Sequence, residues 1–218
     1  MALFQTHLNF GVISSGIVIV PLYGSGMINS NEALALLGAG AIGSILPDLD
    51  SDSSKPSAIA FRVASIFLPL LFLLHFAKDA SLLKLFLLWI ISTAFLRVIF
   101  ELFFKLTSHR GVFHTVGMGL LFGYLNYIAF SFITNDTFAF EIGFFITFGF
   151  LGHLFLDEMT AFMTSSGAFG SALKLYSKHN VFGSVAIYIC LIVLIFFKPI
   201  KIATIDKIFS VLTHIQLV

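Results

Sequence analysis

Long apolar runs separated by short polar breaks dominate the pattern of this chain. About 20 apolar residues in a row are enough for a helix to cross a bilayer. The runs predict membrane helices near residues 10–28, 33–47, 58–76, 82–104, 112–133, 138–156 and 181–197. The second run is short and rich in Gly and Ala, which suits close packing inside a bundle. The pattern therefore predicts an all-α polytopic bundle of about seven membrane helices, or six if the second run is a half-span.

Local signals add detail to the ends of these helices. The letters NSNE at residues 29–32 resemble a capping box that starts the second helix. Pro21 predicts a kink or a break in the first helix. The opening letters MALFQTHLNF lack the basic region of a cleaved signal peptide, so we expect the first run to be retained. Residues 1–197 are expected to form one membrane-embedded helical domain, and residues 198–218 an amphipathic tail on the membrane surface.

The composition agrees with a membrane protein. Of the 218 residues, 58% are hydrophobic and 11% are charged, and the mean hydropathy is +1.02. A soluble domain carries about 25% charged residues. The net charge of +1 gives no reason to expect a nucleic acid partner, and a single cysteine, Cys190, excludes an intrachain disulfide and a multi-cysteine metal site. We therefore expect an integral membrane protein whose partners are membrane lipids.

Most polar residues able to bind a metal ion fall at breaks that the predicted crossings place on one face of the membrane. An even number of crossings separates each of these breaks from the next, so small errors in helix boundaries do not alter the result. The prediction fails if the short second run neither crosses the membrane nor doubles back. The candidate ligands at these breaks are His7, Asp48, Asp50, His109, His114, His153 and Asp157.

The centre of this set is the pair His153 and Asp157, because residues four apart share one face of a helix. Imidazole nitrogens and carboxylate oxygens together suit Zn, Mn or Fe. Seven candidates exceed the needs of one tetrahedral zinc and could serve two ions about 3.5–4 Å apart, which would activate water and polarise a phosphoryl or acyl oxygen. Arg110 could pair with a phosphate or a carboxylate. Glu158, about 100° round the helix from Asp157, is a candidate general base or a group that orients a ligand.

Each of these residues also has a purely structural interpretation. His7 taken alone is typical of an interfacial residue, and the aspartates after the second run could simply end a helix at the water interface. The letters HRGVFH could anchor the chain at the headgroups. His153 could form a structural hydrogen bond with Asp157. Their shared face is the observation that favours a common site.

Four motifs together resemble a known family. An N-terminal TH, then ILPDLDSD, then HRGVFHT and then GHLFLDE are similar to the YdjM-type proteins, which are described as LexA-regulated, inner-membrane, metal-dependent hydrolases. The resemblance covers residues 7–180, and FGSALKLY is also similar. It implies metal-ligand status for the seven His and Asp candidates and a substrate-side role for Arg110.

The same resemblance implies a distant relation to zinc-dependent phospholipase C and the P1-type nucleases. Those are helical enzymes that hold several zinc ions with His and Asp. The match to that wider group is the HxxxD spacing of His153 and Asp157 and the general mixture of His and Asp. The N-terminal ligand arrangement of the zinc enzymes has no match here, so the number of metal ions stays open.

From these observations we expect a membrane-bound hydrolase of the bacterial inner membrane. It would use one or several divalent ions, zinc before manganese or iron, to cleave a phosphoester of a phospholipid or of a lipid-linked substrate. Two alternatives stay open, namely a metal-ion transporter with ligands at mid-membrane and a non-catalytic membrane protein with a structural metal site. Basic residues divide evenly between the two faces, so the positive-inside rule predicts no orientation.

Overall fold

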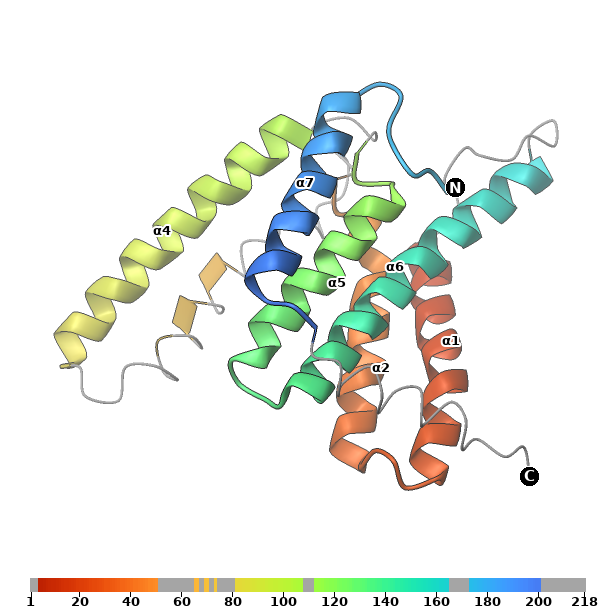
Figure 1. Cartoon of the computed structure of the whole chain (residues 1–218), viewed down its shortest axis with the longest axis horizontal. Helices are drawn as coiled ribbons and strands as arrows, with labels where there is room; N and C mark the ends of the chain where they lie inside the picture. The colour runs from red at the N-terminus through yellow and green to blue at the C-terminus, as the bar shows by residue number, and fades with distance from the viewer. Residues whose placement is uncertain are drawn as a thin grey trace. The chain divides into compact units, whose positions relative to one another are not determined.

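The computed structural model of this chain describes residues 4–50, 65–66, 69–70, 73, 81–107, 112–164 and 173–200. Over these residues the fold is all-helical, without a strand, as the sequence predicts. The α-helices, labelled in Figure 1, are α1 (Phe4–Gly24), α2 (Ser30–Ile45), α4 (Leu82–Thr107), α5 (Val116–Ser131), α6 (Asp136–Thr164) and α7 (Val181–Phe197). A 3-10 turn, η1 (Leu46–Asp50), follows α2.

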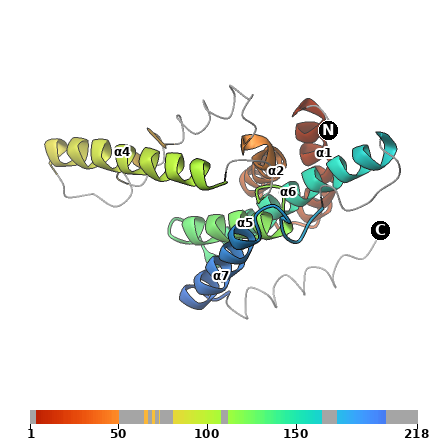
Figure 2. The same cartoon turned by 90° about the horizontal axis from the view of Figure 1, so that it is seen from above.

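The helices belong to two compact units. The first unit consists of Met1–Pro47 and Gly111–Val218, and the second of Asp48–Arg110. Within the first unit, α6 is the central helix, because it packs against α1, α2 and α5 (Figures 1 and 2). Helix α5 also packs against α7. Within the second unit, the indole N–H of Trp89 on α4 donates a hydrogen bond of 3.0 Å to the carbonyl oxygen of Ile66.

The capping box predicted at residues 29–32 is confirmed. The Asn29 side chain accepts hydrogen bonds from the N–H groups of Asn31 and Glu32, and the Glu32 carboxylate accepts one of 2.9 Å from the Asn29 N–H. These contacts satisfy backbone donors that have no partner inside the helix. The preceding helix does not break at Pro21 but continues to Gly24.

Two predicted boundaries were wrong near the candidate site. Helix α6 continues to Thr164 instead of ending near residue 156, so His153 and Asp157 lie inside a helix and not at its end. Helix α5 begins at Val116 and not at residue 112, because Thr115 accepts a hydrogen bond from the Met118 N–H and caps the helix. Most of the predicted span at residues 58–76, and the tail from residue 201, lie outside the described residues.

Two helices are long and apolar enough to cross a bilayer, within the part of the chain that the structure describes. They are Phe4–Gly24 and Asp136–Met163, and the shorter apolar helices are Val116–Ser131 and Val181–Phe197. The expected total of six to seven spans is therefore not confirmed.

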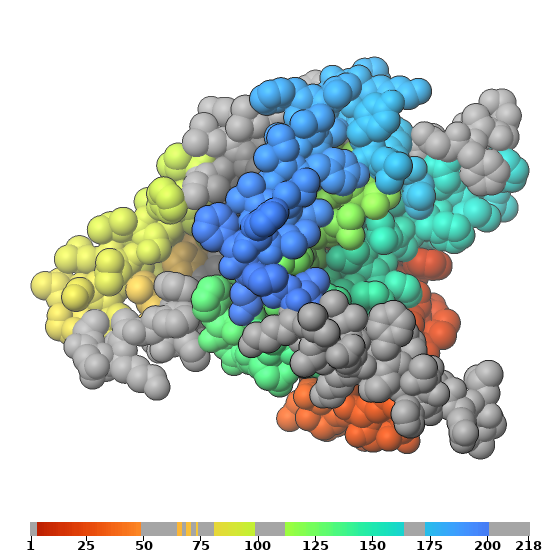
Figure 3. All heavy atoms as spheres, in the orientation of Figure 1, coloured from red at the N-terminus to blue at the C-terminus, as the bar shows by residue number. Residues whose placement is uncertain are grey.

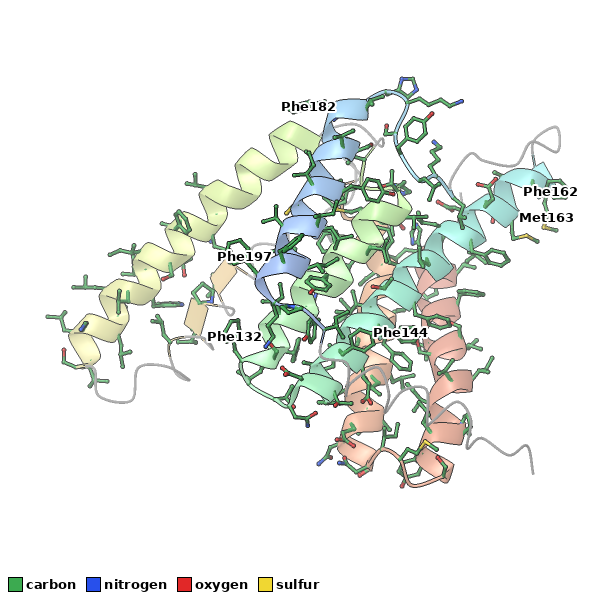
Figure 4. All side chains as sticks on the ribbon, viewed as in Figure 1. Phe132, Phe144, Phe162, Met163, Phe182 and Phe197 are labelled. Atoms are coloured by element: carbon green, nitrogen blue, oxygen red, sulfur yellow. The ribbon has the colours of Figure 1, made fainter. Side chains whose placement is uncertain are left out.

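Large apolar side chains cover the outside of the first unit. Ile13, Ile17 and Val20 on α1 are 62–69% exposed, and Phe182 and Phe197 on α7 are 84–87% exposed. Figure 3 shows the side chains of α7 across one face of this unit. Other exposed apolar residues labelled in Figure 4 are Phe132, Phe144, Phe162 and Met163. Soluble monomers rarely expose large apolar patches, whereas a membrane protein covers exposed apolar side chains with lipid.

Candidate metal centre

Three histidines and one aspartate converge in the first unit. His7 lies in the first turn of α1, His153 and Asp157 lie on one face of α6, and His114 lies just before the N-cap of α5. Their exposed fractions are 1% for His7, 0% for His153, 8% for His114 and 6% for Asp157. A buried carboxylate is costly unless it is paired or bound to a cation. The buried carboxylate of Asp157 therefore has to interact with hydrogen-bond donors or with a cation.

Asp157 contacts two of the imidazole rings. Its Oδ1 lies 3.3 Å from Nε2 of His7, and its Oδ2 lies 3.7 Å from Nε2 of His153. One ligand atom from each of His114, His153 and Asp157 lies within 4.8 Å of the other two. Zinc binds nitrogen and oxygen at about 2.0–2.2 Å, so small side-chain rotations would bring these three atoms onto one ion.

The hydrogen bond from His153 to α2 determines which ring nitrogen faces the centre. Nδ1 of His153 lies 2.7 Å from the carbonyl oxygen of Ser44. Because a carbonyl oxygen only accepts, Nδ1 must carry the proton, and the neutral ring then has its lone pair on Nε2, the nitrogen that faces Asp157. Metal-binding histidines commonly donate their other N–H to a backbone carbonyl in this way.

The donor set fits a divalent ion. Among the described residues, the buried Nδ1 of His7 has no hydrogen-bond partner. Leaving such a group unsatisfied costs about 1–3 kcal/mol. Two stacked imidazoles, a third imidazole and a carboxylate are ligands typical of zinc, and also of manganese and iron.

Close helix packing makes this convergence possible. Gly11 lies one turn after His7, and Gly149 lies one turn before His153. A Cβ atom on Gly149 would overlap the backbone of α2, and one on Gly11 would overlap the side chain of Ser44. The two glycines therefore let α1, α2 and α6 approach closely enough for the His153–Ser44 hydrogen bond to form.

The turn that carries His114 is held by its neighbours. Phe113 is fully buried, and Thr115 is 1% exposed. The Thr115 hydroxyl donates a hydrogen bond of 2.7 Å to the carbonyl oxygen of Val112. Because the residues on both sides of His114 are fixed, its ring keeps a defined edge-on position, with its centroid 5.8 Å from that of His153.

Glu158 has a structural contact next to the centre. Its side chain is 6% exposed, and Oε2 accepts a hydrogen bond of 3.0 Å from the N–H of Leu173. The carboxylate therefore holds the segment that leads into α7. Its role as a general base stays a prediction.

The remaining predicted site residues are Asp48, Asp50, His109 and Arg110. Asp48 and Asp50 follow α2 in the turn η1 and open the second unit, and only the backbone of Asp50 is described. His109 and Arg110 lie outside the described residues. The structure thus brings together four predicted ligands, His7, His114, His153 and Asp157, with Glu158 beside them.

Sequence reasoning missed the contribution of Ser44. Its carbonyl group orients His153, and a backbone group leaves no mark in the sequence. The available signal was the run of Gly and Ala before it, which indicated close packing but not the helix against which it packs.

Comparisons with known proteins agree with the motifs. A search of curated proteins and a search of solved structures each found no significant match. A sequence model of the family described as YdjM inner membrane protein matches residues 1–198. This range contains both candidate membrane spans and all four converging side chains. The chain therefore belongs to the YdjM inner membrane protein family and is an integral protein of the inner membrane.

Proposed function

We propose that this protein is a membrane-bound, metal-dependent hydrolase that cleaves a phosphoester of a phospholipid or of a lipid-linked substrate. The convergence of His7, His114, His153 and Asp157 is the observation that carries this proposal. A divalent ion held there, zinc before manganese or iron, would supply an activated water and polarise a phosphoryl oxygen.

The residues of the chain have distinct tasks in this proposal. His153, oriented by the Ser44 carbonyl, presents Nε2 as a ligand. Asp157, whose carboxylate lies beside Nε2 of both His7 and His153, would supply the negative charge that helps to bind a cation. His7 and His114 complete the set from the two neighbouring segments. The burial of all four keeps bulk water from the ligand atoms, which strengthens their electrostatic interactions.

The sequence motifs supply the remaining parts of the proposal. Asp48, Asp50 and His109 are proposed as further ligands, which would allow a second ion. Arg110 would neutralise the phosphate, and Glu158 would act as a general base or orient a ligand. We also propose, from the motif resemblance, a bundle of about seven spans, a distant relation to zinc-dependent phospholipase C and P1-type nucleases, and LexA-dependent expression in the SOS response.

A lipid substrate is favoured by the surroundings of the centre. Helices α1 and α6 carry both the site and large exposed apolar side chains such as Ile17 and Phe155. His7 lies in the first turn of α1. The ligands are therefore near one end of a helix that is apolar and long enough to cross the bilayer, and headgroups lie at that depth.

Metal content and phosphoester cleavage test this proposal. The protein would be purified in detergent, and its metals measured by elemental mass spectrometry beside His153→Ala, with circular dichroism as the folding control. We expect about one or two equivalents of metal in the wild type and loss in the variant. The wild type should then release phosphate or headgroup from a lipid panel, and chelation should abolish that release. A metal-loaded protein that is inactive on the whole panel would contradict the hydrolase assignment.

A structural metal site is the second candidate, because the centre is so deeply buried. His7 and His153 are at most 1% exposed. Structural zinc sites are closed, whereas catalytic sites keep a position open for water. The two functions separate in the His153→Ala variant. A folded protein without activity supports catalysis, and an unfolded bundle supports a structural ion.

A further inference from the structure

The segment at residues 173–179, which we name the basic strap, is fixed to three helices. Figure 1 shows it in light blue, leading into α7. Its backbone forms four hydrogen bonds with these helices. The Leu173 N–H donates to Glu158 Oε2 on α6 at 3.0 Å, and the Lys174 carbonyl accepts from the Val116 N–H on α5 at 2.8 Å. On α7, the Tyr188 hydroxyl donates to the Leu175 carbonyl at 2.8 Å, and Ser184 Oγ accepts from the Ser177 N–H at 2.9 Å. Because these hydrogen bonds use backbone groups of the strap, its side chains stay available for other contacts.

The strap exposes both apolar and basic side chains. Leu175 and Tyr176 are 67% and 50% exposed. Lys178 is exposed, and Lys174 is partly exposed. Neither lysine forms an ion pair with an acidic side chain within the described residues, whereas Lys198 lies 3.2 Å from Asp136. The chain from residue 173 to residue 198 contains no Asp or Glu, so the strap carries no acidic side chain of its own.

The strap borders the candidate metal centre. Glu158, which holds Leu173, directly follows Asp157 in α6. Val116, which bonds to the Lys174 carbonyl, lies two residues after His114. The strap therefore lies at the end of the unit where the ligands converge.

We propose that the basic strap binds the headgroups of anionic phospholipids. Lys174 and Lys178 would contact the phosphate, while Leu175 and Tyr176 would enter the interface beside them. Tyrosine and lysine are typical of the boundary between lipid and water, and each basic residue near an anionic surface strengthens binding. The exposed apolar side chains favour a lipid over a free phosphate ion, because a free ion gains nothing from them. This binding does not rest on the proposed hydrolase activity.

Native mass spectrometry of the detergent-purified protein tests the strap. The protein would be titrated with phosphatidylglycerol, with phosphatidylcholine as the zwitterionic reference. Lys174→Gln combined with Lys178→Gln should weaken phosphatidylglycerol binding about fivefold per lysine. The matched control, Lys174→Arg with Lys178→Arg, keeps both charges and should keep the binding. Equal binding by the wild type and the Gln variant would overturn the proposal, as would equal loss in the Gln and Arg variants.

Two further experiments distinguish lipid binding by the strap from binding of a free anion and from binding at the metal centre. Inorganic phosphate at millimolar concentration should not displace the lipid, and displacement would indicate a free-anion site instead. Chelation of metals should leave phosphatidylglycerol binding unchanged, since the lysines and not an ion hold the headgroup. If chelation releases the lipid, the metal centre and not the strap binds it, and the proposal is wrong. If the purified protein contains no metal, the hydrolase proposal is wrong, but the test of lipid binding by the strap still applies.

Discussion

The imidazole ring of His7 stacks on that of His153, with ring centroids 3.6 Å apart and planes inclined by 14°. The two rings come from α1 and α6, so two candidate membrane helices meet at this contact. Two protonated imidazoles at this distance would repel each other, whereas neutral rings can stack and share a cation. The stacking therefore links the packing of α1 on α6 to the proposed metal binding, and both can be measured.

Asp157 and its neighbour Glu158 offer a matched pair of substitutions. Asp157→Asn should lower the bound metal at least tenfold, because it removes a charged ligand that lies 3.3 Å from His7 Nε2 and 3.7 Å from His153 Nε2. Glu158→Gln should keep the metal, since a Gln carbonyl oxygen can still accept the Leu173 N–H. Elemental mass spectrometry of both variants checks this.

The metal contents of the two variants show which of the two carboxylates binds the ion. If Glu158→Gln loses metal as completely as Asp157→Asn, then Glu158 acts on the ion itself. If both variants keep the wild-type metal content, the carboxylate of Asp157 is a structural partner of the histidines. Circular dichroism of each variant shows whether any loss of metal follows from unfolding.

Removal of the metal should lower the thermal stability of the wild type. An ion present at 100 times its dissociation constant stabilises the folded state by about 2.7 kcal/mol. Adding EDTA should therefore lower the unfolding midpoint of the wild type, and restoring zinc should recover it. The His153→Ala variant, which lacks a ligand, should show the same midpoint with and without EDTA. An equal shift in both proteins would mean that EDTA acts elsewhere.

The sequence predicted the helices better than it predicted their contacts. The apolar runs correctly indicated α1, α2, α4, α5, α6 and α7, because burial in lipid needs long apolar segments. The end of α6 was wrong, since Asp157 and Glu158 look like the start of a polar loop. In the structure both carboxylates are buried against partners, so the helix continues past them.

The candidate site was predictable in part for a physical reason. Counting the crossings placed His7, His114, His153 and Asp157 on one face, and the structure brings them together. Which ring stacks on which could not be predicted, because it depends on the close approach of glycines in different helices. The Ser44 carbonyl that orients His153 is a backbone group, so no sequence pattern reveals it.

The ion pair between Lys198 and Asp136 should contribute little to stability. Lys198 Nζ lies 3.2 Å from Asp136 Oδ1, and their exposed fractions are 33% and 17%. Exposed pairs typically contribute about 0.2–1 kcal/mol. A double-mutant cycle with Lys198→Gln and Asp136→Asn, read from unfolding midpoints, should give a coupling energy in this range. The ammonium group also lies 5.9 Å from the centroid of the Tyr127 ring, so Lys198→Arg should retain both contacts. A coupling energy indistinguishable from zero would mean that the pair contributes nothing.

Two Gly→Ala substitutions should separate the effect of close helix packing on stability from the effect of helix propensity. Gly149→Ala places a Cβ against the backbone of α2 and should destabilise the protein by about 1–3 kcal/mol. It should also lower metal binding, because His153 lies one turn away on the same face.

Gly38→Ala is the matched control, since its Cβ would meet no atom within 4 Å, and it should stabilise helix α2 by about 0.5–1 kcal/mol. Unfolding midpoints and metal content measured together check both effects. If Gly149→Ala keeps full metal binding, the close approach of α2 and α6 does not control the centre.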